Sequence, residues 1–240
     1  MAETVTGIPS FGTAIQVMTS AEGITPKTFA TVFGVGDIDG PSVAMDETET
    51  TSHSTGVPIK TFIPSLIDPG NLTFPCFWNP SDPTQSPLSA YGLEKLFYAR
   101  TVTSWRLVAT DPGKTTREFR GFVKELGEAY PVSGVVTKNT SIRISGAMTY
   151  VTATVTLVPT TDIDVLKAGE SGTIAVTSSD TVGWFPVSDQ TWVTFTAPTA
   201  PVVGNGSVAY TVAPSVLSVS RTANLRIGDK TFVLTQLGTP

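Results

Sequence analysis

The chain has 240 residues, of which 40% are hydrophobic and 15% are charged, so it is long enough to bury a substantial core. Its formal net charge of −5 argues against ordinary nucleic-acid binding, which needs clustered lysine and arginine to replace the counterions of phosphate. The single cysteine, Cys76, excludes an intramolecular disulfide and a cysteine-rich zinc site, and no apolar run reaches the roughly 20 residues of a membrane-spanning helix.

The first residues, Met-Ala-Glu-Thr, lack the basic and apolar regions of a signal peptide, so we expect the chain to fold in the cytoplasm that makes it.

Strands are predicted along most of the chain, because apolar side chains recur at every second position. The expected strands in the first part span residues 29–35, 71–78, 101–110 and 117–126, and a clear alternation follows at residues 150–157. One face of the second of these strands carries Leu72, Phe74, Cys76 and Trp78. This alternation is typical of antiparallel sheet with one buried face.

A single helix is predicted between Ser86 and Arg100. Ser86 is a capping residue, and Pro87 then occupies the first helical position, where its missing N–H leaves no hydrogen bond unmade. An apolar or small stripe with helical spacing follows, formed by Ser89, Gly92, Leu93, Leu96 and Phe97. This stripe predicts a helix that lies on a sheet.

A change in composition at residues 159–172 predicts an exposed linker, because proline, glycine and acidic residues interrupt the alternation there. We therefore expect one domain at residues 1–160 and another at residues 161–240. Short predicted strands in the second domain span residues 173–177, 207–212 and 231–236. The expected fold class is mainly β, with a sandwich or barrel flanked by one helix, followed by a small β-sandwich.

The residues that enzymes commonly use are scarce. His53 is the only histidine and lies in a polar Thr-Thr-Ser-His-Ser-Thr segment, and the nucleophile, zinc and phosphate motifs are missing. Asp37 and Asp39 have the first spacing of a calcium loop, but the glycine comes too early, so a turn between strands is the better interpretation. We expect no catalytic residue, no metal site and no cofactor.

Five segments in a fixed order connect the first domain with a known family. They are Thr-Phe-Ala-Thr-Val-Phe-Gly-Val-Gly-Asp-Ile-Asp-Gly-Pro at 28–41, Met-Asp-Glu-Thr-Glu-Thr-Thr-Ser at 45–52, Lys-Thr-Phe-Ile-Pro-Ser-Leu-Ile-Asp-Pro-Gly at 60–70, Phe-Arg-Gly-Phe-Val at 119–123 and Ser-Ile-Arg-Ile-Ser-Gly at 141–146. Together with the helix between the third and fourth, they resemble the major tail tube proteins of siphoviruses, phages with long flexible tails. The resemblance covers about half of the chain.

The resemblance implies a structural subunit of the virion, six copies of which form a ring. Such rings stack into a non-contractile tube that conducts DNA during ejection, and an acidic protein suits a lumen that does not bind DNA tightly. The implied partners are further copies of the chain and the tape measure, tail terminator and distal tail proteins. Assembly would occur in the cytoplasm of the host bacterium, without membrane insertion.

The polar segment at residues 46–60 resembles the loop that these proteins extend onto a neighbouring subunit. We therefore predict that it orders on assembly. The candidate interface residues are Asp46, Glu47, Thr48, Glu49, Thr50, Thr51, Ser52, His53, Ser54 and Thr55.

The end of the chain resembles a BACON-type, immunoglobulin-like domain. The matching segments are Val-Ala-Tyr-Thr-Val at 208–212, Arg-Thr-Ala-Asn-Leu-Arg-Ile-Gly at 221–228 and Phe-Val-Leu-Thr-Gln-Leu-Gly at 232–238. The resemblance implies a decoration domain that binds cell-surface carbohydrate, with Trp184 as a candidate for stacking on a sugar. We expect Trp192 to be buried in the sandwich.

A carbohydrate-binding or adhesion module, carried on a phage or cell-surface scaffold, is the alternative function. Rings or tubes of the purified protein in negative-stain micrographs would separate the two hypotheses.

Overall fold

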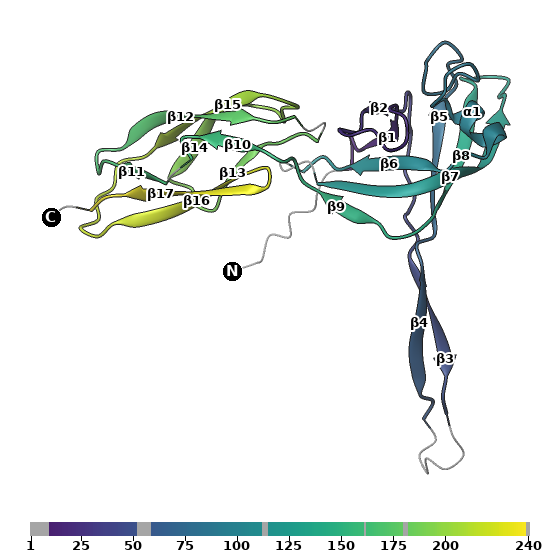
Figure 1. Cartoon of the computed structure of the whole chain (residues 1–240), viewed down its shortest axis with the longest axis horizontal. Coiled ribbons are helices and arrows are strands. Elements are labelled where there is room, and N and C mark those ends of the chain that lie inside the picture. Colours follow the sequence, from purple (N-terminus) through teal and green to yellow (C-terminus); the bar gives the residue numbers. More distant parts are fainter. Residues whose placement is uncertain (1–9, 52–58, 112–114, 161, 180–181, 239–240) are drawn as a thin grey trace.

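The computed structural model describes residues 10–51, 59–111, 115–160, 162–179 and 182–238. This part of the chain is mainly β with one short helix, which confirms the predicted fold class. Two bodies of β-sheet lie side by side, and a two-stranded ribbon leaves the first of them (Figure 1). No helix among the described residues is long and apolar enough to cross a membrane.

The first body is built on a seven-stranded antiparallel sheet. Its strand order is β2-β1-β6-β7-β8-β5, and β9 pairs with the beginning of β7. The strands are β1 (Ala14–Met18), β2 (Phe29–Thr31), β5 (Asn71–Phe77), β6 (Thr103–Val108), β7 (Thr116–Ala129), β8 (Thr137–Ile144) and β9 (Thr149–Val151). The strands predicted at residues 71–78, 101–110 and 117–126 are therefore confirmed, while the one predicted at 29–35 is shorter.

The core of this body lies between the sheet and the helix. Trp105 is fully buried, and its indole Nε1 donates a hydrogen bond to the carbonyl oxygen of Gly121 at 3.1 Å. The other members are Ile15, Val17, Val32, Leu72, Phe74, Cys76, Leu93, Leu96, Leu107, Phe119, Val123, Ile142 and Ile144. The alternating apolar residues of the sequence thus face a shared core, whose burial is the main stabilising term.

Helix α1 (Leu93–Ala99) ends where the sequence predicts but begins six residues after the predicted first helical residue, Pro87. Its end is marked by Arg100, which has a left-handed φ of 53°. The predicted beginning at Ser86 is wrong, because side-chain hydrogen bonds just before it hold the chain in a non-helical conformation. The amide Nε2 of Gln85 donates to the carbonyl oxygens of Phe33 and Phe77, at 2.9 and 2.8 Å.

Close backbone packing also delays the helix. A Cβ atom at Gly92 would lie 1.9 Å from the carbonyl oxygen of Ser86, so only glycine fits immediately before the first helical residue.

The second body is a sandwich of two four-stranded sheets. One sheet has the order β10-β12-β15-β14 and the other β11-β17-β16-β13. The strands are β10 (Thr156–Val158), β11 (Ile163–Val165), β12 (Glu170–Thr177), β13 (Pro186–Ser188), β14 (Val193–Ala197), β15 (Gly206–Val212), β16 (Arg221–Ile227) and β17 (Lys230–Gln236). They include the strands predicted at residues 173–177, 207–212 and 231–236.

The prediction of an exposed linker at residues 159–172 is wrong. Strand β11 lies within this range and pairs in parallel with β17, and Val165 is buried in the second core. The prolines and glycines there mark turns inside the sandwich, which composition alone does not distinguish from a linker.

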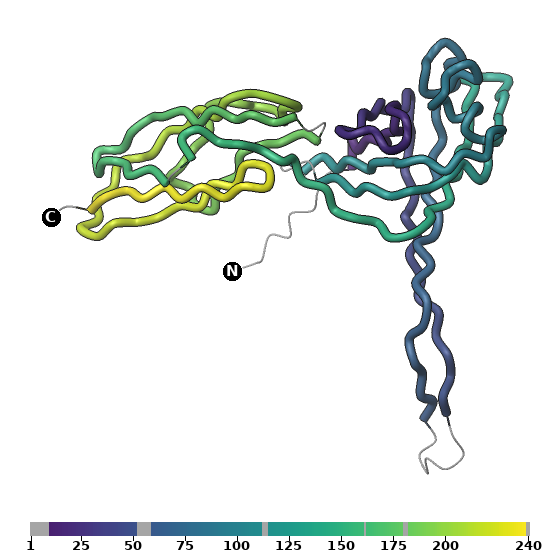
Figure 2. The backbone as a smooth tube through the Cα atoms, in the orientation of Figure 1, coloured from purple at the N-terminus to yellow at the C-terminus, as the bar shows by residue number. Residues whose placement is uncertain are grey.

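The alternation at residues 150–157 is divided between the two bodies. Strand β9 ends at Val151 and belongs to the first sheet, whereas Ala153, Val155 and Leu157 belong to the second core. The chain crosses between the bodies at this point (Figure 2). We therefore propose a domain boundary at residue 152 instead of residue 160.

A truncation tests this boundary. A chain that ends at residue 152 keeps every strand of the first sheet and its whole core, so it is expected to fold and to assemble as the full chain does. Circular dichroism and electron microscopy measure the two properties. Loss of folding would mean that the sandwich contributes to the stability of the first body.

Candidate functional site: an exposed β-ribbon

The predicted interface segment forms part of a two-stranded antiparallel ribbon. Strand β3 (Ala44–Glu49) pairs with β4 (Phe62–Asp68), and neither strand pairs with any other described strand. Every residue of β3 is exposed, and so is every residue of β4 except Asp68. The ribbon projects away from both bodies (Figure 1), so neither of its faces is covered within the chain.

A β-bulge near the middle of the ribbon accommodates a proline. Met45 pairs with Ile67 and Glu47 pairs with Pro64, so two residues of β4 lie opposite Asp46. Pro64 donates no backbone hydrogen bond, which a free-edged ribbon tolerates better than the centre of a sheet. The bulge therefore fixes the register without interrupting the pairing.

Large apolar side chains are exposed along the ribbon. Leu66 is 75% exposed, and the other large apolar residues of the two strands are Met45, Phe62, Ile63 and Ile67. They lie on both faces: Met45 and Ile67 form one cross-strand pair, while Ile63 pairs with Thr48 on the opposite face. Because a two-stranded hairpin is marginally stable alone, such a surface is typical of a segment that becomes covered by another molecule.

The root of the ribbon is held by a tight turn. The carboxylate oxygen Oδ1 of Asp68 accepts the backbone N–H of Gly70 at 2.8 Å and pairs with Arg143 at 2.8 Å. These contacts, the backbone hydrogen bond above all, hold the pKa of the Asp68 carboxyl below its usual value. Gly70 has a φ of +73°, and a Cβ atom there would lie 2.0 Å from the carbonyl oxygen of Ser42. The direction of the ribbon is therefore set by glycine and a paired carboxylate.

Gly70→Ala is expected to destabilise the chain by about 2–4 kcal/mol, since it adds a clash with Ser42 to an unfavourable φ. Gly23→Ala is the matched control: Gly23 has a φ of +85°, but nothing lies within 4 Å of the added Cβ. It is expected to cost only about 1–2 kcal/mol in denaturant unfolding. Equal losses in the two variants would show that the close approach at the root does not matter.

The polar end of the ribbon is joined by side-chain contacts between its strands. Lys60 pairs with Glu49 at 2.9 Å, and this hydrogen bond lowers the pKa of the Glu49 carboxyl. The backbone N–H of Thr50 donates to the carbonyl oxygen of Thr61 at 2.8 Å. Of the predicted interface residues, Asp46, Glu47, Thr48 and Glu49 lie in β3 and Thr50 and Thr51 follow it; Ser52, His53, Ser54 and Thr55 lie outside the described residues.

Strand β4 supplies most of the exposed apolar surface, and the sequence-based prediction missed it. The signal was present as Phe-Ile-Pro-Ser-Leu-Ile at residues 62–67, an apolar run that contains a proline. The predicted strands do not include this run. Apolar residues on both faces of a ribbon leave no simple alternation to recognise.

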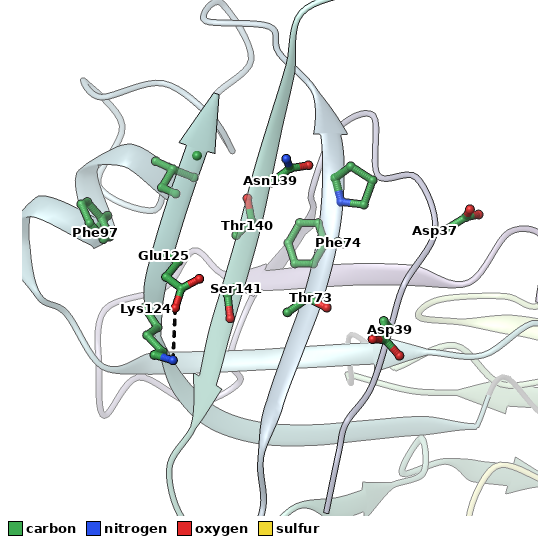
Figure 3. Close-up of a pocket in the computed structure, with 13 residues that line it drawn as sticks. Asp37, Asp39, Thr73, Phe74, Phe97, Lys124, Glu125, Asn139, Thr140 and Ser141 are labelled. Atoms are coloured by element: carbon green, nitrogen blue, oxygen red, sulfur yellow. Dashed lines mark ion pairs between the residues drawn. The ribbon is translucent and has the colours of Figure 1, made fainter. Parts of the chain in front are cut away.

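The first body also has a groove of 630 Å³, which is lined by charged, polar and apolar residues (Figure 3). The groove crosses β5, β8 and β7, with Asp37 and Asp39 at one side and the Lys124–Glu125 ion pair at the other. Asp39 and Thr73 exchange two backbone hydrogen bonds of 2.9 Å, so the Asp37 segment extends the sheet edge.

The two tryptophans of the sandwich differ from the predictions made for them. Trp184 is only 1% exposed and its indole Nε1 donates to the carbonyl oxygen of Gly204 at 2.7 Å, so its ring offers no face to a sugar. The carbohydrate contact assigned to Trp184 is therefore wrong. Trp192, predicted to be buried, is half-buried, and the guanidinium of Arg221 lies 4.2 Å from the centre of its ring.

Comparison with known proteins gives matches among solved structures alone. No family model and no curated protein matches the sequence. The chain is similar to one in the tail of an empty gene transfer agent particle, refined with helical and C6 symmetry, with 12% identity and a TM-score of 0.46; the match covers 57% of this chain and 94% of that one. A chain in the virion of a native gene transfer agent particle is similar with 11% identity and a TM-score of 0.43, covering 56% of this chain and 94% of that one.

Proposed function

We propose that the chain is a structural subunit of a long non-contractile phage tail, and that its copies assemble through the β3–β4 ribbon. The observation that carries this proposal is the ribbon itself, with two free edges and apolar side chains on both faces. A monomer would leave this surface in water, where exposed strand edges also promote uncontrolled pairing. Coverage by neighbouring copies removes both liabilities.

Six copies in a ring, and rings stacked into a tube, are the assembly that the family resemblance implies for such a ribbon. Contact between two different surfaces of identical subunits closes into rings or extends into filaments. The acidic balance of the chain suits passage of DNA through the lumen during ejection, since phosphate is repelled instead of captured. The sandwich formed by β10 to β17 would then lie outside the tube as a decoration domain.

Negative-stain electron microscopy of the purified chain over a range of concentrations tests the proposal. Rings or tubes of uniform diameter are expected above a threshold concentration. A single monomeric species at every concentration, including in the presence of preformed tail tips, would contradict it. The burial of Trp184 removes one candidate sugar contact from the alternative, a carbohydrate-binding or adhesion module.

A further inference from the structure

A ribbon that binds another copy requires an acceptor, and the first body has one candidate with matching chemistry. This acceptor groove lies between the end of α1 and strand β7 and has a volume of 570 Å³. Its lining includes Phe97, Tyr98, Arg100, Val102, Phe122 and Lys124.

The floor of the acceptor groove is apolar and aromatic. Tyr98 is 74% exposed and packs edge-to-face on Phe97, with 5.4 Å between the ring centres. Val102 beside them is also exposed. Exposed aromatic rings next to aliphatic side chains provide the contacts that contribute most to protein interfaces.

Two cations flank this floor. Arg100 follows the last residue of α1, and Lys124 projects from β7, where it pairs with Glu125 at 3.1 Å (Figure 3). Within the part of the chain that the structure describes, no ion pair is formed by Arg100. A polar side chain of opposite charge on a partner would therefore find a cation available at the edge of the groove.

The ribbon carries the complementary surface. Asp46 and Glu47 lie on β3, and neither forms an ion pair with another described residue, whereas Glu49 is paired with Lys60. Glu47 shares a face with Met45, Phe62 and Ile67, as the cross-strand pairing and alternation require. This face therefore presents apolar side chains beside a carboxylate, which matches an apolar groove flanked by cations.

We propose that the acceptor groove binds the ribbon of a second copy of the chain, with Glu47 directed toward Arg100 and Lys124. The ribbon leaves its own body in the direction away from α1 (Figure 1), so it cannot reach the groove of the same chain. Donor and acceptor are thus different surfaces, and each copy can bind one neighbour and be bound by another. The inference rests on the proposed function, because it assigns the partner surface of the same ribbon.

A pair of tyrosines tests the assignment without disturbing the core. Tyr98→Ala is expected to raise the threshold concentration for assembly about tenfold or more, because the ring is a central contact of the groove. Tyr150→Ala is the matched control, since Tyr150 is 75% exposed and lines a different groove, of 650 Å³, at the root of the ribbon. It is expected to leave the threshold unchanged. A large effect of Tyr150→Ala with none of Tyr98→Ala would move the acceptor to the root groove and overturn the proposal.

Charge exchange provides the second test. The ribbon variant E47K and the groove variant R100E are each expected to assemble poorly, and a chain carrying both changes is expected to recover most of the assembly. Circular dichroism verifies that each variant is folded. If the groove variant is unfolded, the comparison of Tyr98→Ala with Tyr150→Ala tests the acceptor groove in its place. Assembly of the unmodified chain without recovery in the double variant would refute the acceptor and leave the proposed function standing. Failure of the unmodified chain to assemble would refute both.

Discussion

Excision of the ribbon is expected to abolish ring and tube formation and to leave a folded monomer. The change replaces residues 44–68 with a Gly-Gly link between Val43 and Pro69. None of the residues of β3 or β4 belongs to the hydrophobic core, so the melting temperature should change by only a few degrees. Analytical ultracentrifugation together with electron microscopy measures the loss of assembly.

A second variant keeps both strands of the ribbon and changes only its exposed apolar side chains. Replacement of the five exposed apolar residues of the ribbon by threonine preserves strand propensity but removes the surface that a neighbour would cover. It is expected to assemble as poorly as the excised chain. The exchanged residues are Met45, Phe62, Ile63, Leu66 and Ile67. Normal tubes from either variant would show that assembly uses another part of the molecule.

Lys138→Ala is expected to cause a large loss of stability, about 3 kcal/mol or more, because it removes a buried cation from between two carboxylates. The side chain of Lys138 is 1% exposed, and its Nζ lies 2.8 Å from Glu94 and 3.1 Å from Glu128. The ammonium also lies 5.3 Å from the centre of the Trp78 ring. The ion pairs connect α1 with β7 and β8, so their loss removes a polar link between the helix and the sheet.

The pKa values of these groups indicate how the cluster responds to pH. Burial disfavours the charged form of Lys138, but hydrogen bonds from it to Glu94 and Glu128 outweigh burial and raise its pKa. Its contribution to stability is therefore complete below the ordinary lysine pKa and is lost as the pH rises through the raised one. The pKa of Glu128 is lowered, first by the hydrogen bond from the Tyr130 hydroxyl and then by Lys138.

Lys60→Ala is the control for Lys138→Ala. Lys60 forms an ion pair of similar length with Glu49, but that pair is exposed on the ribbon, and solvent screening leaves exposed pairs little effect on stability. Urea unfolding of both variants measures the difference. Adding Glu94→Gln to Lys138→Ala is expected to recover part of the loss, because one unpaired carboxylate is removed. Similar stabilities of the two lysine variants would show that burial of the cluster is unimportant.

The strands that could be predicted from the sequence are those with one buried face. In β5, Leu72, Phe74 and Cys76 alternate with half-buried residues, so burial imposes a period of two on the sequence. The end of α1 was also predictable, because the periodic stripe stops near Arg100. Its beginning was not, since contacts of Gln85 with residues distant in the chain hold the preceding segment in turns.

The candidate site was only half predictable. The polar residues of β3 were identified through family resemblance, whereas β4 was missed because its apolar residues face no core of their own chain. The boundary that we propose differs from the predicted one for a related reason: residues 151 and 153 continue one alternation, but Val151 pairs with the first sheet through β9, whereas Ala153 lies in the second core. Local pattern contains no information about which core a strand will join.

A cryo-electron microscopy reconstruction of tubes assembled from the purified chain tests the central claim most directly. We expect the β3–β4 ribbon of each copy to lie against a neighbouring copy, with its apolar side chains buried. The hydrogen bond from Gly70 to Asp68 at the root of the ribbon should be retained. Tubes in which the ribbon projects freely into solvent or into the lumen would contradict the claim.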